Sequence, residues 1–177
     1  MVREVLVLGN PVLRTKCEYV TSFNTKFLQQ EIQDIKETLE DFRQKNGFGR
    51  GIAAIQIGII KRIIGLNLGN GSFVIINPKI IITSRDKMIL WDDCMSFPDI
   101  MVKVERYKKI NIEYQDETGE SREWKNLSPA ESELLQHEID HLDGILAIDK
   151  VVDSKSIIYK SEYRKNLEYY QQMIIDG

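Results

Sequence analysis

The chain is 177 residues long and carries 24 lysine or arginine and 27 aspartate or glutamate side chains, a formal net charge of −3. A chain of this length can bury a substantial core, so we expect residues 1–177 to form a single domain. The balanced charge offers no basic surface for nucleic acid, and no apolar run reaches the ~18 residues of a membrane span, so we expect neither a nucleic-acid partner nor a membrane protein.

The two cysteines, Cys17 and Cys94, are too few for a disulfide framework. They fit a reducing cytoplasm, where a thiolate stays free to bind a metal ion. We interpret Cys17, which lies in a mixed polar stretch, as structural. Residues 1–4 carry charge and lack the apolar region of an export signal, so we expect a cytoplasmic protein.

Residues 24–46 show the first strong periodic pattern. Five apolar side chains recur at alternating spacings of four and three: Leu28, Ile32, Ile35, Leu39 and Phe42. This spacing predicts a long amphipathic helix whose apolar stripe faces the core. Asn24 is a suitable N-cap, and Gly47 is expected to end the helix.

The next segment is rich in glycine, with Gly47, Gly49 and Gly51 ahead of a run of small and apolar residues. Glycines so close together indicate unusual backbone angles or the close approach of another part of the chain. Gln56 is the only side-chain amide in the apolar run and should have a hydrogen-bonding partner. The segment lacks the Gly-Lys-Ser/Thr of a phosphate loop, and its simplest interpretation is a turn followed by a buried strand.

Residues 61–115 have the composition and alternation of β-strands. The predicted strands are residues 62–68, 73–76, 79–83, 88–91 and 109–114. Gly-Asn-Gly at 69–71 predicts a hairpin, and residues 121–124 can pair back after a turn at 116–119. This region therefore favours short antiparallel connections.

A helix is predicted at about residues 129–142. Ser128 is a suitable N-cap, Pro129 suits the first turn, and Glu131 completes a capping box. Gly144 follows at a place where a left-handed residue is wanted. These signals make the helix the best-defined element of the sequence.

This helix contains His-Glu-x-x-His at residues 137–141. Positions four apart lie on one face of a helix, so the only two histidines of the chain can direct ring nitrogens at one metal ion. Glu138 can then act as a general base toward a metal-bound water without being a ligand. A catalytic metal usually has a third protein ligand, here a carboxylate or one of the thiols of Cys17 and Cys94. Two histidines at this spacing can also be ordinary core or surface residues.

Beyond the helix, residues 145–148 predict a short extended run and residues 154–174 a terminal helix. Four side chains would share the inward face of that helix: Ile158, Tyr163, Leu167 and Tyr170. Strands outnumber helices, and the hairpins are short. The expected fold class is α+β, with mostly antiparallel sheets packed around the central His-Glu-x-x-His helix, a long N-terminal helix and a C-terminal helix.

Three segments resemble motifs of the peptide deformylase family. Residues 49–56 resemble its Gly-x-Gly-Leu-Ala-Ala-x-Gln motif, residues 92–96 its Glu-Gly-Cys-Leu-Ser motif, and residues 136–144 match its Gln-His-Glu-x-Asp-His-Leu-x-Gly motif. The order and approximate spacing of the motifs also agree. The resemblance covers nearly the whole chain and implies the fold of that family.

The resemblance implies a set of metal ligands, namely Cys94, His137 and His141. It implies one divalent metal ion as cofactor, natively Fe(II), with Zn or Ni also able to support activity. Thiolate and imidazole suit several of these metals, so the ligand types alone do not choose among them.

The resemblance also implies the groups that act on the substrate. Glu138 takes the place of the general base. Gln56 and the backbone N–H of Met95 take the places of the donors that stabilise the formyl oxygen. Gly51 takes the place of the glycine whose main chain pairs with the substrate.

Three residues depart from the family's pattern. Arg50 and Glu133 stand where members usually carry apolar residues close to the substrate's first side chain, and Asp93 replaces a glycine beside Cys94. Arg50 and Glu133 are either solvated or paired at the pocket rim, where they would weaken binding of a methionine side chain, whose burial elsewhere contributes roughly 1.5–3 kcal/mol. Asp93 is either a turn residue without effect or a source of negative charge near the metal.

The expected function is removal of the N-formyl group from the N-terminal methionine of newly made polypeptides. The alternatives are a related hydrolase for another N-formyl or small amide substrate, a His-Glu-x-x-His endopeptidase and an inactive metal-binding homologue. An upstream cysteine argues against the endopeptidase, and retention of Glu138 and Gln56 argues against the inactive homologue. The implied partner is an N-formylated peptide, and a contact of the C-terminal helix with the ribosome exit region is left open.

Overall fold

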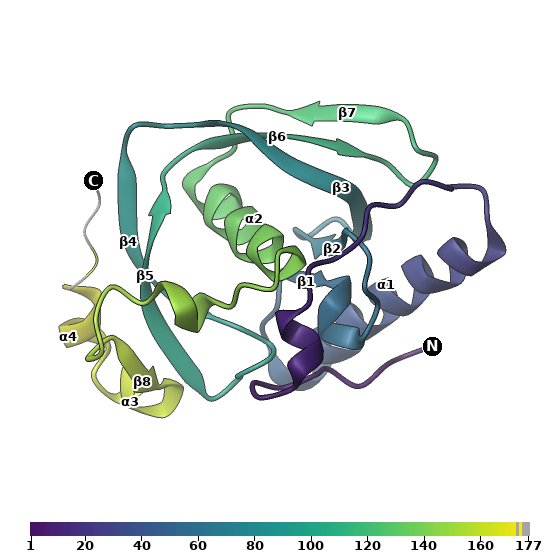
Figure 1. Ribbon diagram of the computed structural model, residues 1–177. Coiled ribbons are helices and arrows are strands. Elements are labelled where there is room, and N and C mark those ends of the chain that lie inside the picture. Colours follow the sequence, from purple (N-terminus) through teal and green to yellow (C-terminus); the bar gives the residue numbers. More distant parts are fainter. Residues whose placement is uncertain (173, 175–177) are drawn as a thin grey trace.

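Two antiparallel sheets enclose one helix, α2 (Pro129–Leu142), in the computed structural model, which describes residues 1–172 and 174 (Figure 1). The remaining helices are α1 (Lys26–Asn46), α3 (Lys160–Lys165) and α4 (Leu167–Gln171), with 3₁₀ turns η1 (Pro11–Arg14), η2 (Ala54–Ile57) and η3 (Ala147–Lys150). Within the described residues, no helix combines the length and apolar character needed to cross a membrane.

The larger sheet has the strand order β1-β2-β3-β6-β7 and the smaller one β4-β5-β8. The strands are β1 (Gly51–Ala53), β2 (Ile63–Asn67), β3 (Ser72–Thr83), β4 (Lys87–Asp93), β5 (Ile100–Tyr107), β6 (Ile110–Gln115), β7 (Ser121–Trp124) and β8 (Ile157–Tyr159). Helix α2 contacts β1 and β2 of the first sheet and β5 of the second. The predicted α+β class, with antiparallel sheets around the motif helix, is confirmed.

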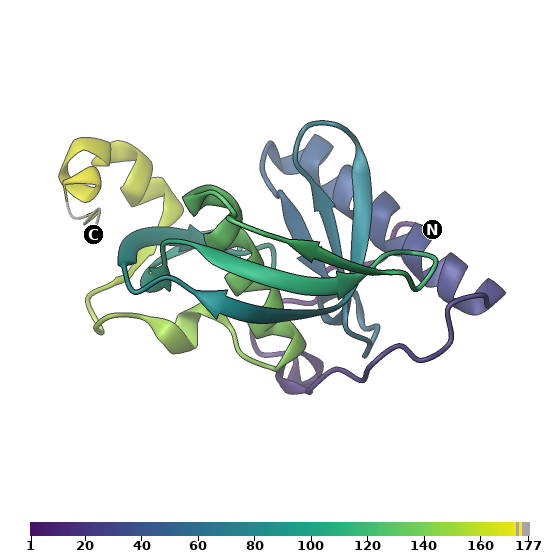
Figure 2. The ribbon, with the colours of Figure 1, turned by 90° about the horizontal axis from the view of Figure 1, so that it is seen from above.

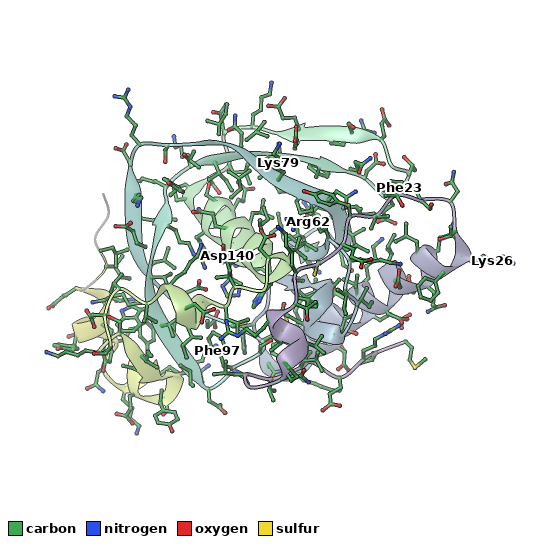
Figure 3. The ribbon with its side chains drawn as sticks, in the orientation of Figure 1. Phe23, Lys26, Arg62, Lys79, Phe97 and Asp140 are labelled. Carbon is green, nitrogen blue, oxygen red and sulfur yellow. The ribbon has the colours of Figure 1, made fainter. Side chains whose placement is uncertain are left out.

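Helix α1 packs its apolar stripe against β2 and β3, as Figure 2 shows from above. Its first residue, Lys26, lies at the outer edge of the molecule (Figure 3). The N-cap is Thr25, whose hydroxyl accepts the Leu28 N–H at 3.1 Å, so the predicted Asn24 cap is wrong by one position. Thr25 has the extended backbone that a cap needs, and its side chain reaches the third helical N–H. Gly47 ends the helix at φ 73°, as predicted.

Strand β3 is continuous, although two strands at 73–76 and 79–83 were predicted. The register with β6 shifts between Ile76 and Lys79, where Asn77 has a left-handed φ of 54°. The Asn77 carboxamide accepts the Val20 N–H at 2.9 Å and donates to the Val20 carbonyl at 2.8 Å. These contacts compensate for the ladder bonds that the bulge removes, so the strand continues through it.

The buried strand predicted after the glycines is only three residues long. It ends at Ala53, and η2 follows. The Gln56 side-chain oxygen accepts the Ala53 N–H at 2.9 Å, which turns the chain and supplies the partner expected for this amide. The turn directs Gln56 toward the carboxyl end of β4 and the residues that follow it.

The C-terminal part differs most from prediction. The extended run at 145–148 is instead largely η3, capped by the Asp149 side chain, which accepts the Leu146 N–H at 2.8 Å. The helix predicted at 154–174 is β8 followed by α3 and α4, and residue 173 lies outside the described residues. The β-branched residues of β8 complete an edge of the smaller sheet by pairing with β5, which outweighs the helical pattern.

Two of the four residues predicted to face inward, Tyr163 and Tyr170, do pack against the rest of the protein. Tyr163 and Tyr170 both contact Trp91, with ring centroids 6.0 and 5.2 Å from it. Ile158 pairs with Met101 in the sheet instead, and Leu167 is 42% exposed. The aromatic residues therefore hold α3 and α4 against the outer face of β4.

Helix α2 begins with the predicted capping box. The Ser128 hydroxyl accepts the Glu131 N–H at 3.3 Å, and the Glu131 carboxylate accepts the Ser128 N–H at 2.8 Å. Replacing Ser128 with alanine leaves a helical N–H without its acceptor. We expect Ser128→Ala to lower the free energy of unfolding by about 1 kcal/mol, measured by denaturant unfolding. Ser154→Ala, at an exposed position outside the helices, is the control, and an equal effect of both substitutions would contradict the capping role.

Cys17 is a core residue, as interpreted from the sequence: it is 4% exposed, and its N–H donates to the Leu142 carbonyl at 2.8 Å. Burial raises the pKa of the thiol to about 11, with Arg62 opposing and Asp143 adding to the shift. The folded protein therefore retains a proton that the unfolded chain, in which the thiol has its ordinary pKa of 9.0, releases first.

It follows that ionisation of Cys17 in the unfolded chain destabilises the native protein between pH 9 and pH 11. We expect wild type to lose about 2 kcal/mol of stability across this window relative to Cys17→Ala, which has no thiol to ionise. Denaturant unfolding at pH 8 and pH 11 measures the difference. A difference between the two proteins that does not change with pH would disprove the shift.

Candidate active site

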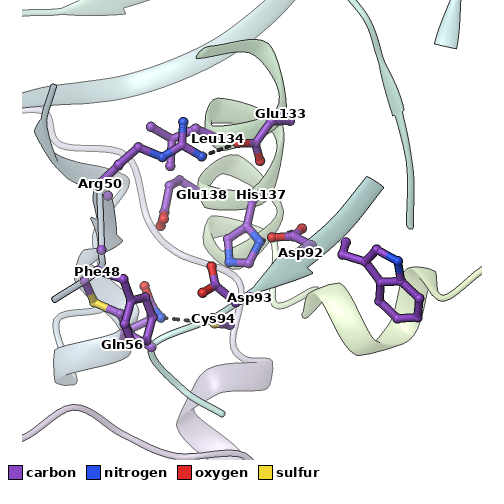
Figure 4. Close-up of a pocket in the computed structure, with 14 residues that line it drawn as sticks. Phe48, Arg50, Gln56, Asp92, Asp93, Cys94, Glu133, Leu134, His137 and Glu138 are labelled. Carbon is purple, nitrogen blue, oxygen red and sulfur yellow. Dashed lines mark hydrogen bonds and ion pairs between the residues drawn. The ribbon is translucent and has the colours of Figure 1, made fainter. Parts of the chain in front are cut away.

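A cavity of about 290 Å³ lies between α2, β1 and the segment after β4 (Figure 4). Nine of the ten residues singled out from the sequence for this site line it: Arg50, Gly51, Gln56, Asp93, Cys94, Met95, Glu133, His137 and Glu138. The tenth, His141, is fully buried one helical turn beyond His137. The tertiary structure thus brings three distant segments of the chain to one place.

Cys94, His137 and His141 place their donor atoms close together. The Nε2 atoms of the two histidines are 3.1 Å apart, and the Cys94 Sγ is 3.3 Å from the His141 Nε2. A tetrahedral ion with ligand bonds of 2.0–2.3 Å would hold its donors roughly 3.3–3.6 Å apart. The three buried side chains therefore fit one divalent metal ion in donor type and in spacing.

His137 is oriented by a carboxylate on β4, in the smaller sheet. Its Nδ1 lies 2.9 Å from the Asp92 Oδ2, so the Nε2 faces the other donors. Burial alone would lower the pKa of His137, but the Asp92 carboxylate raises it well above the usual value. Metal binding at Nε2 would therefore displace the proton from that nitrogen, while the Nδ1–H continues to donate to Asp92.

Asp92 is held in turn by Arg106, which donates to it at 3.1 Å and also pairs with Asp140 of α2. Figure 3 places Asp140 on the central helix. Burial raises the pKa of Asp92, but His137 and Arg106 outweigh this effect and hold it below the usual value. This buried network ties α2 to the smaller sheet and keeps Asp92 ionised.

His141 has the opposite electrostatic environment. Burial, reinforced by the neighbouring His137, lowers its pKa well below the usual value. Its ring is therefore neutral, the form in which imidazole binds a metal ion. Among the described residues, its Nδ1 has no hydrogen-bonding partner.

Glu138 directs its carboxylate into the cavity. Its Oε2 is buried and without a hydrogen bond in the part of the chain that the structure describes. Burial raises the pKa of the carboxyl to about 7, with the His137 charge opposing. A carboxyl with a pKa near neutrality can both accept and return a proton, as a general base requires.

Gly51 is needed because β1 passes directly over this carboxyl. A Cβ atom at Gly51 would lie 2.8 Å from the Glu138 Oε1, closer than a side chain can approach. The glycine therefore lets the backbone of β1 reach Glu138. Since β1 forms an edge of the larger sheet, this backbone also borders the cavity.

Gln56 is held at the cavity by several contacts. Its amide nitrogen donates to the Ser96 Oγ at 3.1 Å and, more weakly, to the Cys94 Sγ at 3.5 Å. The N-terminal segment fixes the same region, because the Leu6 and Leu8 N–H groups donate to the Gln56 and Ser96 carbonyls at 2.7 and 2.8 Å. The long bond to sulfur is the one that Gln56 could exchange for another acceptor.

Met95 contributes its backbone to the same corner. Within the described residues, its N–H makes no hydrogen bond. The neighbouring Ser96 N–H points to the Cys94 Sγ at 3.4 Å. An unused N–H beside a weakly bound amide provides two donors for one substrate oxygen.

Arg50 and Glu133 form an ion pair at the cavity, on the side of Glu138 away from Cys94 (Figure 4). Arg50 also donates to the Ala130 carbonyl at 3.0 Å, in the first turn of α2. Burial raises the pKa of Glu133, and Arg50 opposes the rise. The paired arrangement considered from the sequence is therefore the one observed.

Asp93 has a cationic partner that the sequence did not indicate. Its carboxylate pairs with Lys160 at the start of α3, and the Lys160 ammonium lies 3.4 Å from the centroid of the Phe48 ring. The negative charge of Asp93 is therefore compensated locally rather than directed at the donor atoms of the site. Sequence reasoning missed Lys160 because 67 residues separate it from Asp93.

Three further residues support the site without having been singled out. Asp92 lies in the 92–96 motif, but no role was predicted for it. A ligand histidine commonly donates its second ring N–H to a carboxylate such as this one. Arg106 could have been noticed as a charged residue in an apolar strand. Ser96 carried no signal of its own.

A buried cysteine sulfur and two imidazoles around one point, beside a carboxyl of raised pKa, are typical of mononuclear metal-dependent hydrolases. The family model for polypeptide deformylases matches residues 2–156. The chain belongs to this family, as the three motifs suggested.

Individual relatives agree with this assignment. The chain is 36% identical to the peptide deformylase of Thermotoga neapolitana over 156 residues, which are 88% of this chain and 91% of that protein. The crystal structure of the Thermotoga maritima peptide deformylase superposes with a TM-score of 0.78 at 35% identity, covering 86% of this chain and 99% of the other. The Legionella pneumophila peptide deformylase gives a TM-score of 0.79 at 28% identity, covering 98% and 97%.

The donor geometry predicts that metal content depends on Cys94 and not on Cys17. We expect Cys94→Ala to lower bound divalent metal from about one ion per chain to near zero, because two histidines alone leave the site without its thiolate. Cys17→Ala, the matched control, should keep full metal content. Elemental analysis after gel filtration measures both, and stoichiometric metal in Cys94→Ala would rule out the cysteine as a ligand.

Proposed function

We propose that the protein is a metal-dependent hydrolase that removes the N-formyl group from the N-terminal methionine of newly made polypeptides. The observation that carries the proposal is the meeting of Cys94, His137 and His141 beside Glu138, under a strand that only glycine allows so close. Membership of the polypeptide deformylase family supports it.

In this proposal Cys94, His137 and His141 hold one divalent metal ion, natively Fe(II), with Zn or Ni as working substitutes. The ion would supply a Lewis acid and a water molecule of lowered pKa. The mixed thiolate and imidazole donor set supports a transition metal over Mg²⁺ or Ca²⁺, which prefer oxygen ligands.

Glu138 moves the protons of the reaction. Its carboxylate accepts a proton from the attacking water and returns it to the amine that leaves when the formyl C–N bond breaks. Burial and the absence of a hydrogen bond at Oε2 within the described residues support this role, because the carboxyl pKa of about 7 matches both transfers.

Gln56 and the Met95 N–H stabilise the formyl oxygen as negative charge develops on it. Gln56 gives up its weak bond to the Cys94 sulfur and keeps its bond to Ser96. Loss of one such donor typically lowers the rate about 10²–10³-fold.

The free edge of β1 receives the substrate's main chain. Gly51 offers backbone groups beside Glu138, and an extended peptide can add to a sheet edge through such groups. The formyl group would then lie at the donor cluster, with the first side chain near Arg50 and Glu133.

The same proposal places the enzyme in the cytoplasm, where formylated chains would be met during synthesis. Both cysteines are free thiols, which is consistent with a reducing compartment. A contact with the ribosome exit region would bring substrate to the site, and α3 and α4 are the elements we would examine for it.

A second substrate class is favoured by one observation, the Arg50–Glu133 ion pair in the cavity wall. A charged wall suits a formylated substrate other than formyl-methionine. An endopeptidase and an inactive homologue gain no support from any comparable contact.

The direct test of the proposed function is hydrolysis of a formyl-Met tripeptide by protein purified anaerobically with Fe(II). We expect Glu138→Gln to lower kcat about 10²–10⁴-fold while bound metal is unchanged, because the isosteric amide cannot accept the proton. Glu113→Gln, on an exposed part of β6, is the matched control and should keep wild-type activity. Equal activity of wild type and Glu138→Gln would remove Glu138 from the mechanism.

A further inference from the structure

The residues beside the reacting group define where the substrate's first side chain must lie. Arg50 comes directly before Gly51, the first residue of the strand that covers Glu138, and Glu133 precedes His137 by four residues on α2. On a helix that separation is just over one turn, about 6 Å. A peptide whose formyl group lies at Glu138 therefore places its next side chain beside the Arg50–Glu133 pair.

These two side chains are fixed in place rather than free. The guanidinium of Arg50 pairs with Glu133 and donates to the Ala130 carbonyl at 3.0 Å (Figure 4). The Arg50 carbonyl accepts the Asn67 N–H at 2.9 Å, which anchors its backbone to the end of β2. The pair thus bridges β1 and α2 across one side of the cavity.

Both side chains of the pair keep some contact with water, Arg50 more than Glu133. The Arg50 side chain is 46% exposed and the Glu133 side chain 15%. An apolar substrate side chain placed here would displace water from both charged groups and return no hydrogen bond. A neutral side chain with a donor and an acceptor would replace that water, since Arg50 has donors and Glu133 has acceptor positions beyond those used in the pair.

A charged side chain is a poorer fit for the same site. It would pair with one member of the ion pair and leave the other without its partner in a partly buried place. The rest of the wall still suits a chain of methylene groups, because Leu134 and Phe48 also line the cavity. The side chain best matched is therefore methylene-rich near its backbone and carries a neutral amide at its end.

We propose that the Arg50–Glu133 pair sets the specificity for the first side chain, so that this protein deformylates formyl-Gln peptides about as well as formyl-Met peptides. This inference rests on the proposed function. Glutamine has nearly the length of methionine and differs from it mainly in its hydrogen-bonding end. A wall made only of apolar side chains would bury that amide without a hydrogen-bonding partner and so weaken its binding.

The test compares three tripeptides that differ only in the first residue after the formyl group: methionine, norleucine and glutamine. Norleucine controls for length without sulfur. The measured quantity is the ratio of kcat/KM for each peptide to that for glutamine, with the Fe(II)-loaded full chain. We expect the methionine-to-glutamine ratio to stay below about tenfold in wild type, against roughly 10²-fold where the amide is buried without a partner.

Two double variants test the cause. Arg50→Val with Glu133→Ile gives an apolar wall and should raise the ratio at least tenfold, through a higher KM for the glutamine peptide. Arg50→Glu with Glu133→Arg exchanges the charges, keeps an ion pair and should keep the ratio near the wild-type value. Metal content and thermal unfolding of each variant identify any that is misfolded, and the other variant then decides.

The outcomes distinguish the inference about specificity from the proposed deformylase function. A wild-type ratio above about tenfold, or an unchanged ratio in the apolar variant, overturns the inference and leaves deformylation intact. Failure of metal-loaded wild type to process any of the three peptides overturns the proposed function and the inference together. A low wild-type ratio that rises in the apolar variant and is retained on charge exchange supports both.

Discussion

The contact between the backbone of β1 and the carboxyl group of Glu138 is the constraint on which the site depends. Glu138 loses its water because Gly51 passes over it, and the lack of a Cβ at that position makes the approach possible. Burial then raises the pKa of the carboxyl to about 7. The packing of β1 on Glu138 therefore helps to set both the position and the proton affinity of the base.

The smaller sheet supplies the charged residues that orient His137. Asp92 at the end of β4 orients His137, and Arg106 of β5 holds Asp92 while also pairing with Asp140 on α2. Removing any member would leave a buried charge without its partner, which is costly in a dry interior. The two histidine donors are thus held on α2 and oriented from the smaller sheet, and Cys94 follows β4 directly.

The cavity wall shows how a protein can keep its reaction centre and alter its surroundings. Arg50–Glu133 and Asp93–Lys160 are ion pairs at the edge of the site, each joining elements far apart in the sequence. Neither pair includes a donor atom of the Cys–His–His cluster. Changes of this kind can shift substrate choice without altering proton transfer.

The sequence by itself determined the local features: the α1 stripe, the capping box at Ser128, the spacing of His137 and His141, and the kinship of three motifs, because each depends on neighbours a few residues apart. It could not distinguish a C-terminal helix from β8 and two short helices, since the open edge of β5 that recruits β8 exists only after folding. Likewise, the partners of Asp92 and Asp93 became visible only in three dimensions. Charge pairing across sheets is set by packing, and packing decides which of many available cations each carboxylate meets.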